Sequence, residues 1–196
     1  MKRPPLILAS TSPYRRQLLE RLNVPFSVIN PEVDESPLPH ESPQALVERL
    51  SREKAAVVGQ KNRGAVVIGS DQVAIIDAEV LGKPGNHERA AAQLRQASGK
   101  EVVFLTGLCC YMTTQSTEYV QSSVVPFRVQ FRVLSEEKID RYLKQDKPYH
   151  CAGSFKSEGL GIALFERMIG DDPTALMGLP LIRLSQMLEE AGILIL

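Results

Sequence analysis

The stretch LILASTSPYRRQLL, residues 6–19, joins a short apolar run directly to a helix signal. The apolar run Leu6–Ala9 has the length of a buried strand. Ser12 is a favoured N-cap residue, and Pro13 suits the first helical turn because its ring already fixes a helical φ angle. The leucines that follow recur on one stripe of the predicted helix. A strand that passes at once into an amphipathic helix is typical of an α/β protein.

The rest of the chain continues this alternation of strand and helix signals. Apolar runs predict strands over residues 26–29, 65–76, 102–112 and 120–134. Helix starts are predicted at Ser42-Pro43, Asn86, Ser135 and Leu179, and the last helix is expected to reach Ala191. Residues 127–133 alternate apolar side chains with Arg and Gln, which indicates a sheet with one solvated face. No repeat or long linker divides the chain, so residues 1–196 are predicted to form a single α/β domain with a mixed sheet.

The composition excludes several classes of protein. Hydrophobic residues make up 43% of the 196 residues and charged residues 23%, as in ordinary globular domains. The 23 basic residues are balanced by 23 acidic ones, so no positive surplus is left for a polymeric nucleic acid. The apolar run after Met1-Lys2-Arg3 is too short for a signal peptide, and no run is long enough to span a membrane. Cys109, Cys110 and Cys151 form no disulfide framework, so we expect packed thiols in a cytoplasmic protein.

Asp71 interrupts the apolar strand predicted over residues 65–76. It lies in the segment GSDQ, residues 69–72, where a buried carboxylate without a partner would be costly. One interpretation is a turn between two shorter strands, in which Asp71 caps its own backbone. The other is a general base or a metal ligand at the end of a central strand. The spacing alone does not choose between them.

Two cations stand where a helix favours other residues. Arg15 lies on the apolar stripe and in the first helical turn, where the helix dipole disfavours positive charge. Lys54 follows Leu50 by four residues and therefore falls on the apolar face of its helix. Each side chain either extends over apolar surface to reach water or points into a cleft that holds an anion. Lys83 and Glu35, taken alone, are indistinguishable from ordinary charged loop residues.

Common catalytic templates are missing from the sequence. There is no P-loop, no dinucleotide-binding glycine motif and no nucleophile elbow. The histidines at positions 40, 87 and 150 match neither zinc-site spacing nor a catalytic triad. Several cations, a few carboxylates and small-residue turns remain. This set suits a nucleotide polyphosphate together with a hard metal ion.

Short motifs along nearly the whole chain have the order and character of one family. They are LASTSPYRRQLL at 8–19, VDE at 33–35, REKA at 52–55, GSDQV at 69–73, GKP at 82–84, TG at 106–107, AGSFKSEG at 152–159 and GLP at 178–180. The chain therefore resembles the Maf family of nucleoside triphosphate pyrophosphatases. The resemblance implies an elongated mixed β-sheet flanked by helices, two lobes around a deep cleft and often a homodimer. It also implies metal-dependent hydrolysis between the α- and β-phosphates of a nucleotide.

The resemblance also implies roles for individual residues. Asp71 would be the proton acceptor that activates water. Four residues would hold phosphate oxygens: Ser10, Arg15, Lys54 and Lys83. Glu35, together with Asp71, would place a divalent cation, Mg²⁺ or Mn²⁺. Under this hypothesis the misplaced cations of the two helices point at a polyphosphate.

Three positions at which members of the family differ indicate a subfamily. They are Tyr14, Gln72 and Glu158, where the common dTTP/UTP-cleaving type has arginine, threonine and glutamine. The trio resembles the YceF subfamily, which is associated with 7-methyl-GTP. N7-methylation leaves guanine cationic, so an aromatic face and a carboxylate both suit that base. The alternative is that Tyr14 only packs and that Glu158 is an exposed loop acid.

The resemblance thus predicts a cytoplasmic 7-methyl-GTP pyrophosphatase that acts on a small-molecule nucleotide and removes modified nucleotides. Two alternatives remain open. One is a Maf enzyme for dTTP, UTP or other modified nucleotides. The other is a nucleotide-binding regulator of cell division, in which catalysis is incidental. A water-activating base such as Asp71 favours an enzyme, because a pure binder has no need of one.

Overall fold

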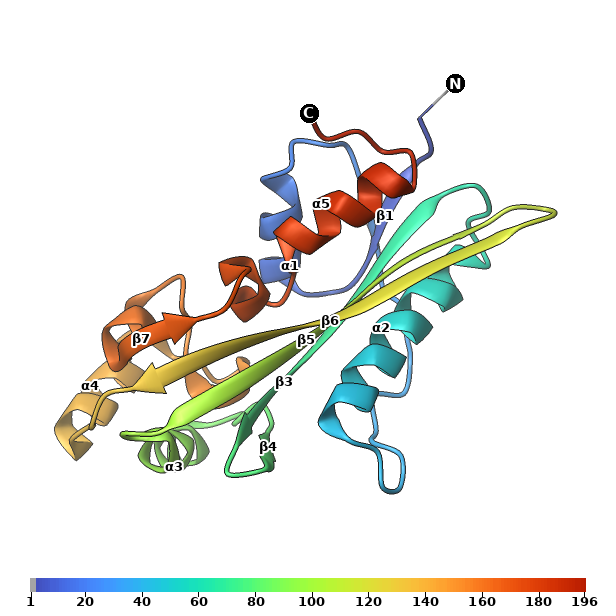
Figure 1. Ribbon diagram of the computed structural model, residues 1–196. Coiled ribbons are helices and arrows are strands. Elements are labelled where there is room, and N and C mark those ends of the chain that lie inside the picture. Colours follow the sequence, from blue (N-terminus) through green and yellow to red (C-terminus); the bar gives the residue numbers. More distant parts are fainter. Residues whose placement is uncertain (1–2) are drawn as a thin grey trace.

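The computed structural model describes residues 3–196, which form a seven-stranded mixed sheet with helices packed on both faces (Figure 1). The strands are β1 (Leu6–Ala9), β2 (Ser27–Ile29), β3 (Val66–Ile76), β4 (Glu79–Leu81), β5 (Glu101–Thr113), β6 (Glu118–Phe131) and β7 (Phe165–Ile169). The α-helices are α1 (Pro13–Glu20), α2 (Pro43–Gly59), α3 (His87–Ala97), α4 (Glu136–Asp146) and α5 (Leu181–Glu190). Short 3-10 helices are η1 (Ala152–Ser154), η2 (Leu160–Leu164) and η3 (Pro173–Met177). The strand order is β2-β1-β3-β5-β6-β7, and β4 pairs with β3.

Strand β3 has two different neighbours on one of its edges. It pairs in parallel with β1 as far as Gly69, which lies opposite Ala9 at the end of β1. On the same edge, antiparallel pairing with β4 begins at Ala74. The other edge pairs with β5 from Val67 to Ile75. Residues 70–73 therefore have a strand on one side only, just beyond the carboxyl end of β1.

Alternate residues of β3 serve opposite faces of the sheet, as the period of two requires. Val66 and Ile68 pack with α1 and α5, whereas Ala74 and Ile76, on the same face, pack with α3 and α4. Val67 lies on the opposite face in the cluster beneath α2. The first face thus carries two separate apolar clusters, and residues 70 and 72 emerge between them. Residue 71 faces the side that α2 covers.

The predicted fold class is confirmed, and so are the helix starts predicted at Ser12, Ser42, Asn86 and Ser135. The side chains of four N-cap residues each accept a hydrogen bond from a backbone N–H of the first turn: Ser12, Ser42, Asn86 and Ser135. Strands β5 and β6 occupy the two long predicted runs. The acidic segment 31–41 contains no helix or strand.

The predicted interruption of β3 was wrong. The strand runs through residues 69–72 without a turn, because its pairing with β5 continues across them. The interpretation of Asp71 as a turn residue is therefore wrong, and so is its placement at a strand end. Asp71 lies in the middle of β3, opposite Gly107 of β5.

Smaller corrections concern the ends of elements. Strand β6 stops at Phe131, so Val133, expected on the apolar face, is 85% exposed. The last helix begins at Leu181 because Gly178 has a φ of 100° and Pro180 is its extended N-cap. The short strands β4 and β7 and the 3-10 helices η1, η2 and η3 were not predicted.

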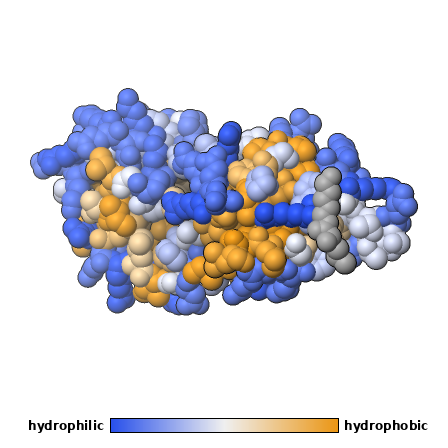
Figure 2. Space-filling model, turned by 90° about the horizontal axis from the view of Figure 1, so that it is seen from above, coloured by the Kyte–Doolittle hydropathy of each residue, from blue (hydrophilic) through white to orange (hydrophobic). Residues whose placement is uncertain are grey.

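Within residues 3–196, no helix has both the length and the apolar character that a membrane crossing requires. Exposed apolar side chains do gather on the face seen in Figure 2, over α5 and the C-terminal residues. Ile182 of α5 is 53% exposed, and Leu194, which follows α5, is 71% exposed. Met1 and Lys2, part of the charged chain start discussed above, lie outside the described residues.

Helix α2 lies so close to the sheet that two strand positions exclude any side chain. A Cβ on Gly69 would collide with the carbonyl oxygen of Ser51, and one on Gly107 with that of Val47. We expect Gly107→Ala to lower the free energy of unfolding by about 1–3 kcal/mol, because α2 must move away from the sheet. Urea denaturation measures this change. Gly82→Ala is the control, because a Cβ there meets nothing within 4 Å and its φ is unexceptional; equal effects of the two variants would contradict the packing argument.

Candidate active site

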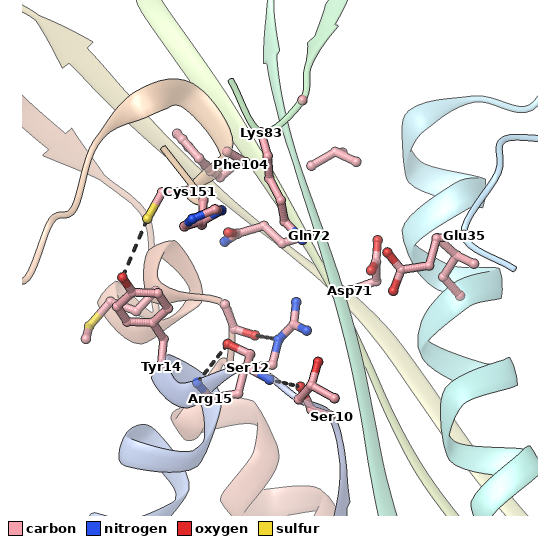
Figure 3. A pocket seen from close by; sticks show the side chains of 18 of the residues that line it. Ser10, Ser12, Tyr14, Arg15, Glu35, Asp71, Gln72, Lys83, Phe104 and Cys151 are labelled. Atoms are coloured by element: carbon pink, nitrogen blue, oxygen red, sulfur yellow. Dashed lines mark hydrogen bonds between the residues drawn. The ribbon is translucent and has the colours of Figure 1, made fainter. Parts of the chain in front are cut away.

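A cavity of about 790 Å³ opens at the uncovered edge of β3. The residues predicted from sequence line it together: Ser10, Tyr14, Arg15, Glu35, Lys54, Asp71, Gln72, Lys83 and Glu158. Figure 3 shows Tyr14 and Cys151 at one side of this cavity and Asp71 with Glu35 at the other. The carboxyl end of a parallel strand is a common location for ligand sites in α/β proteins.

Lys54 joins the two carboxylates of the cavity. Its Nζ lies 2.7 Å from Asp71 Oδ1 and 2.5 Å from Glu35 Oε1. The lysine side chain is only 5% exposed and that of Asp71 13%, whereas Glu35 is 56% exposed. The sequence placed Lys54 on the apolar face of α2, and the structure confirms that position. Its positive charge is balanced by two carboxylates, Asp71 of β3 and Glu35 of the acidic segment 31–41.

The pKa of Glu35 is lowered by its surroundings. Burial by itself would raise it, but the hydrogen bond and the charge of Lys54 act in the opposite direction, and Lys83 and Arg15 add to them. The carboxylate therefore stays ionised below its ordinary range. A loop acid that sequence alone could not distinguish is thus held inside a cluster of cations.

The first turn of α1 supplies the polar wall next to these carboxylates. Ser12 Oγ caps the helix by accepting from the Arg15 N–H, and Ser10 Oγ accepts from the Ser12 N–H at 3.1 Å. The Arg15 side chain donates through Nε to the Gly178 carbonyl at 2.8 Å. Burial lowers the pKa of Arg15, while Asp71 and Glu35 partly restore it. Among residues 3–196 the hydrogen bond of the Arg15 side chain therefore goes to a main-chain carbonyl and not to a carboxylate, and Arg15, which is partly buried, lines the cavity.

Tyr14 and Glu158 lie at the other end of the cavity. Cys151 Sγ donates to the Tyr14 hydroxyl at 3.7 Å. The pKa of Tyr14 is raised, first by burial, then by this contact and by the nearby charge of Glu158. The phenol is therefore neutral. Glu158 is exposed and Tyr14 is partly buried, as the alternative to a binding role expects. Both residues nevertheless line the cavity.

The side-chain amide nitrogen of Gln72 forms hydrogen bonds within the protein. Nε2 donates to the carbonyls of Ala175 and Leu176, at 2.7 and 3.2 Å, and to Thr106 Oγ1 at 3.0 Å. These contacts fix η3 against β3. The amide oxygen is the group that Gln72 has left for a ligand.

Sequence reasoning missed residues that support the cavity rather than reach into it. Ser70 Oγ lies 2.9 Å from the Gly178 carbonyl and 2.8 Å from that of Gly107. Cys151 lines the cavity instead of packing in the core, which corrects the expectation for that thiol. Cys109 and Cys110 are buried as expected, and burial raises the pKa of Cys109 to about 12. A serine flanked by apolar residues gives no sequence signal of such a role.

A divalent cation would find only part of its ligands in the protein. Among residues 3–196, no three acidic, histidine or cysteine side chains gather as a metal cluster. Glu35 and Asp71 are nevertheless close to one another through Lys54, and carboxylate oxygens suit Mg²⁺ or Mn²⁺. Mg²⁺ in particular commonly uses one or two carboxylates and completes its shell with water and phosphate oxygens. The two carboxylates fit such an ion.

Comparison with known proteins places the chain in a family. The family model described as "Maf-like protein" matches residues 5–191. The chain belongs to the Maf family. The cavity is therefore the candidate active site of a Maf protein, and each of the quoted motifs except Thr106-Gly107 contributes residues to its lining.

Curated relatives of this Maf protein cover nearly its whole length. A protein of Nitrosococcus oceani named "7-methyl-GTP pyrophosphatase" is 57% identical over 189 residues, which are 96% of this chain and 94% of the relative. Relatives with the same name are 56% identical in a Polaromonas species, over 96% of this chain and 85% of the relative, and 52% identical in Nitrosospira multiformis, over 96% and 94%.

The ion cluster generates a direct electrostatic prediction. We expect Lys54→Met, which keeps a stem of similar length, to raise the pKa of Glu35, because the strongest attraction on that carboxylate is removed while its burial persists. An NMR titration of the side-chain carboxyl carbon measures the change. Lys61→Met, in the exposed segment after α2, is the control. A Glu35 pKa that is the same in both variants would contradict the assignment of Lys54 as its partner.

Proposed function

We propose that this Maf protein hydrolyses 7-methyl-GTP to 7-methyl-GMP and pyrophosphate. Glu158 lies near Tyr14, whose pKa its charge raises. The observation that carries the proposal is the order of groups along one cavity, with Tyr14 at one end, Arg15 in the middle and Asp71 at the other end. This order matches a nucleotide, whose cationic base and polyphosphate lie at opposite ends. The names of the three relatives support the same substrate.

Asp71 is the proposed proton acceptor. Its Oδ1 accepts a hydrogen bond from Lys54 Nζ at 2.7 Å, which holds the carboxylate in position. A water that donates to the carboxylate would lose its proton as it attacks the α-phosphorus in line with the departing pyrophosphate. The rigid strand β3, paired with β5 at this point, fixes the base relative to the phosphates.

Cations around the base are proposed to stabilise the phosphate charge. Arg15, Lys54 and Lys83 line the cavity, and Ser10 adds a hydroxyl. Guanidinium and ammonium groups stabilise the charge that grows on a leaving pyrophosphate. Glu35 and Asp71 would hold the proposed Mg²⁺ or Mn²⁺, which supplies further neutralisation of phosphate charge when bound. Removal of divalent cations with a chelator is accordingly expected to stop hydrolysis.

The base end is proposed to select a methylated purine. N7-methylguanine carries a positive charge, which favours the face of Tyr14 and the carboxylate of Glu158. Glu158 can also accept from the N1–H and the amino group of guanine, which an amide does less well. Gln72 would contribute through its amide oxygen while its nitrogen holds η3.

Two other functions remain as alternatives. A Maf enzyme for dTTP, UTP or another modified nucleotide would use the same phosphate end with a different base preference. A nucleotide-binding regulator of cell division would bind without turnover. A pyrophosphate-release screen over a nucleotide panel that includes 7-methyl-GTP separates all three, and release from no nucleotide in the presence of Mg²⁺ would favour the regulator.

Asp71→Asn tests the chemistry. The amide keeps the shape of the carboxylate but cannot take a proton, so turnover should fall about 100-fold or more. Nucleotide binding should persist, because Arg15 and the lysines remain. Pyrophosphate release measures turnover, and isothermal titration measures binding. Asp77→Asn, at an exposed turn after the same strand, is the control. Near-normal turnover in Asp71→Asn would move the base to another residue, with Glu35 first.

Glu158→Gln tests the selection of the base. The loss of a charge-assisted pair in a partly closed pocket costs about 1.5–3 kcal/mol, or about 10- to 100-fold in kcat/KM for 7-methyl-GTP. Turnover of UTP, whose base is uncharged, should change far less. Glu166→Gln on β7, an exposed acid outside the cavity, is the matched control. An equal loss for both nucleotides would show that Glu158 does not read the base.

A further inference from the structure

The loop that carries Lys83 lies in open surroundings. Residues 82–86 connect β4 to α3, and within them Gly82, Lys83 and Gly85 are exposed. A Cβ added to either glycine would meet nothing within 4 Å. Lys83 lines the cavity but forms no salt bridge among residues 3–196. The place of its ammonium group therefore depends on how the main chain of the loop is held.

Gln93 of α3 joins this loop to another part of the cavity wall. Its Nε2 donates to the carbonyl of Gly82, the residue directly before Lys83, at 3.0 Å. Its Oε1 accepts from the Ser154 hydroxyl at 2.5 Å. One amide thus uses its donor on the loop and its acceptor on η1. Gln93 does not itself line the cavity, so it can act on a ligand only through the segments that it joins.

The η1 side of this bridge is firmly placed. Ser154 is fully buried and has a φ of 62°, a conformation that persists in a residue with a side chain only where its surroundings fix it. Gly153 before it has a φ of 74°, and a Cβ there would lie 3.3 Å from Phe104. The Phe155 ring after it packs edge-to-face against Phe104 and Phe165. A turn held on both sides in this way is a fixed point for the more open loop.

A second hydrogen bond holds the far side of the same loop. The Gly85 N–H donates to the Tyr149 carbonyl at 2.9 Å. The loop is therefore tied both before and after Lys83. Only the tie before it, which Gln93 makes, comes from a side chain, so a substitution can remove it without changing the main chain of the loop.

We propose that Gln93 is a positioning residue for Lys83, which it holds at the cavity by tying the loop 82–86 to the Gly153-Ser154 turn. The inference rests on the proposed function and deepens it, because Lys83 is one of the groups proposed to hold phosphate oxygens. A lysine whose main chain is already fixed loses less conformational freedom when it binds an anion. Without the bridge the same ammonium group is present, but the ligand has to order the loop.

A double-mutant cycle with Lys83 tests this role. The probe is inorganic pyrophosphate, the proposed product, titrated calorimetrically in the presence of Mg²⁺. Gln93→Met keeps the length and the helix preference of the side chain but forms neither hydrogen bond. It should weaken pyrophosphate binding about 3- to 10-fold when Lys83 is present and have no further effect in the Lys83→Met background. Gln96→Met is the matched control on α3, because the Gln96 amide donates to Glu79, outside the cavity lining.

Ser154→Ala tests the other end of the bridge. This variant leaves Gln93 in place and removes only its fixed point on η1. We expect weaker pyrophosphate binding here too, and again only while Lys83 is present. A loss that persists in the Lys83→Met background would show that Ser154 acts on the fold and not through the loop.

The cycle separates positioning from a purely structural role. Equal losses from Gln93→Met with and without Lys83 would show that Gln93 only stabilises the fold, and no loss with Lys83 present would show that the loop needs no bridge; both results overturn the inference. The proposed function is judged separately, because the cycle measures binding and needs no turnover. A wild-type protein that releases no pyrophosphate from 7-methyl-GTP would refute that function, whatever the cycle gives.

Discussion

The site depends on a difference in length between two neighbouring strands. Strand β1 ends at Ala9, opposite Gly69, whereas β3 continues for seven more residues to Ile76. One edge of β3 is thereby left open until β4 begins to pair at Ala74. The chain leaving β1 turns into α1 at this point, so the helix start and the open edge form one wall. The candidate active site is the cavity that opens at this unpaired edge of β3.

The regular alternation of a strand explains how one short segment serves several purposes. In β3, Ser70 and Gln72 face the side of η3 and hold its carbonyls. Asp71 faces the other side, where Lys54 of α2 meets it. The close approach of α2, permitted by Gly69 and Gly107, brings the lysine within reach. Successive side chains of a strand point to opposite faces of the sheet. A turn at residues 69–72 would not have placed Ser70 and Asp71 on opposite faces in this way.

Charge is distributed unevenly along the cavity although the chain is neutral as a whole. Lys54 pairs with the carboxylates of Glu35 and Asp71 at the proposed phosphate end. At the proposed base end the carboxylate of Glu158 accepts from the Ser157 hydroxyl, and among residues 3–196 it forms no salt bridge. Such a gradient orients a ligand that is negative at one end and positive at the other. A net charge of zero therefore says little about the local field.

Local signals in the sequence determined the elements and the candidate residues. Cap residues fixed the helix starts, apolar periodicity fixed the long strands, and the anomalous positions of Arg15 and Lys54 marked the cavity, because these signals act within a few residues. The resemblance of scattered motifs added the family, and it predicts roles for residues such as Lys83 that carry no local signal.

Only the tertiary structure decided what these residues meet. A turn was one of the two interpretations of Asp71, because an isolated strand gives no reason to contain a carboxylate. Lys54, seventeen residues away, supplies that reason. The contacts of Arg15 and Gln72 with residues 175–178 join segments more than a hundred residues apart. Periodicity is a property of neighbours in the chain, whereas pairing of charges across the cavity depends on how the strands end and on which helix covers each face.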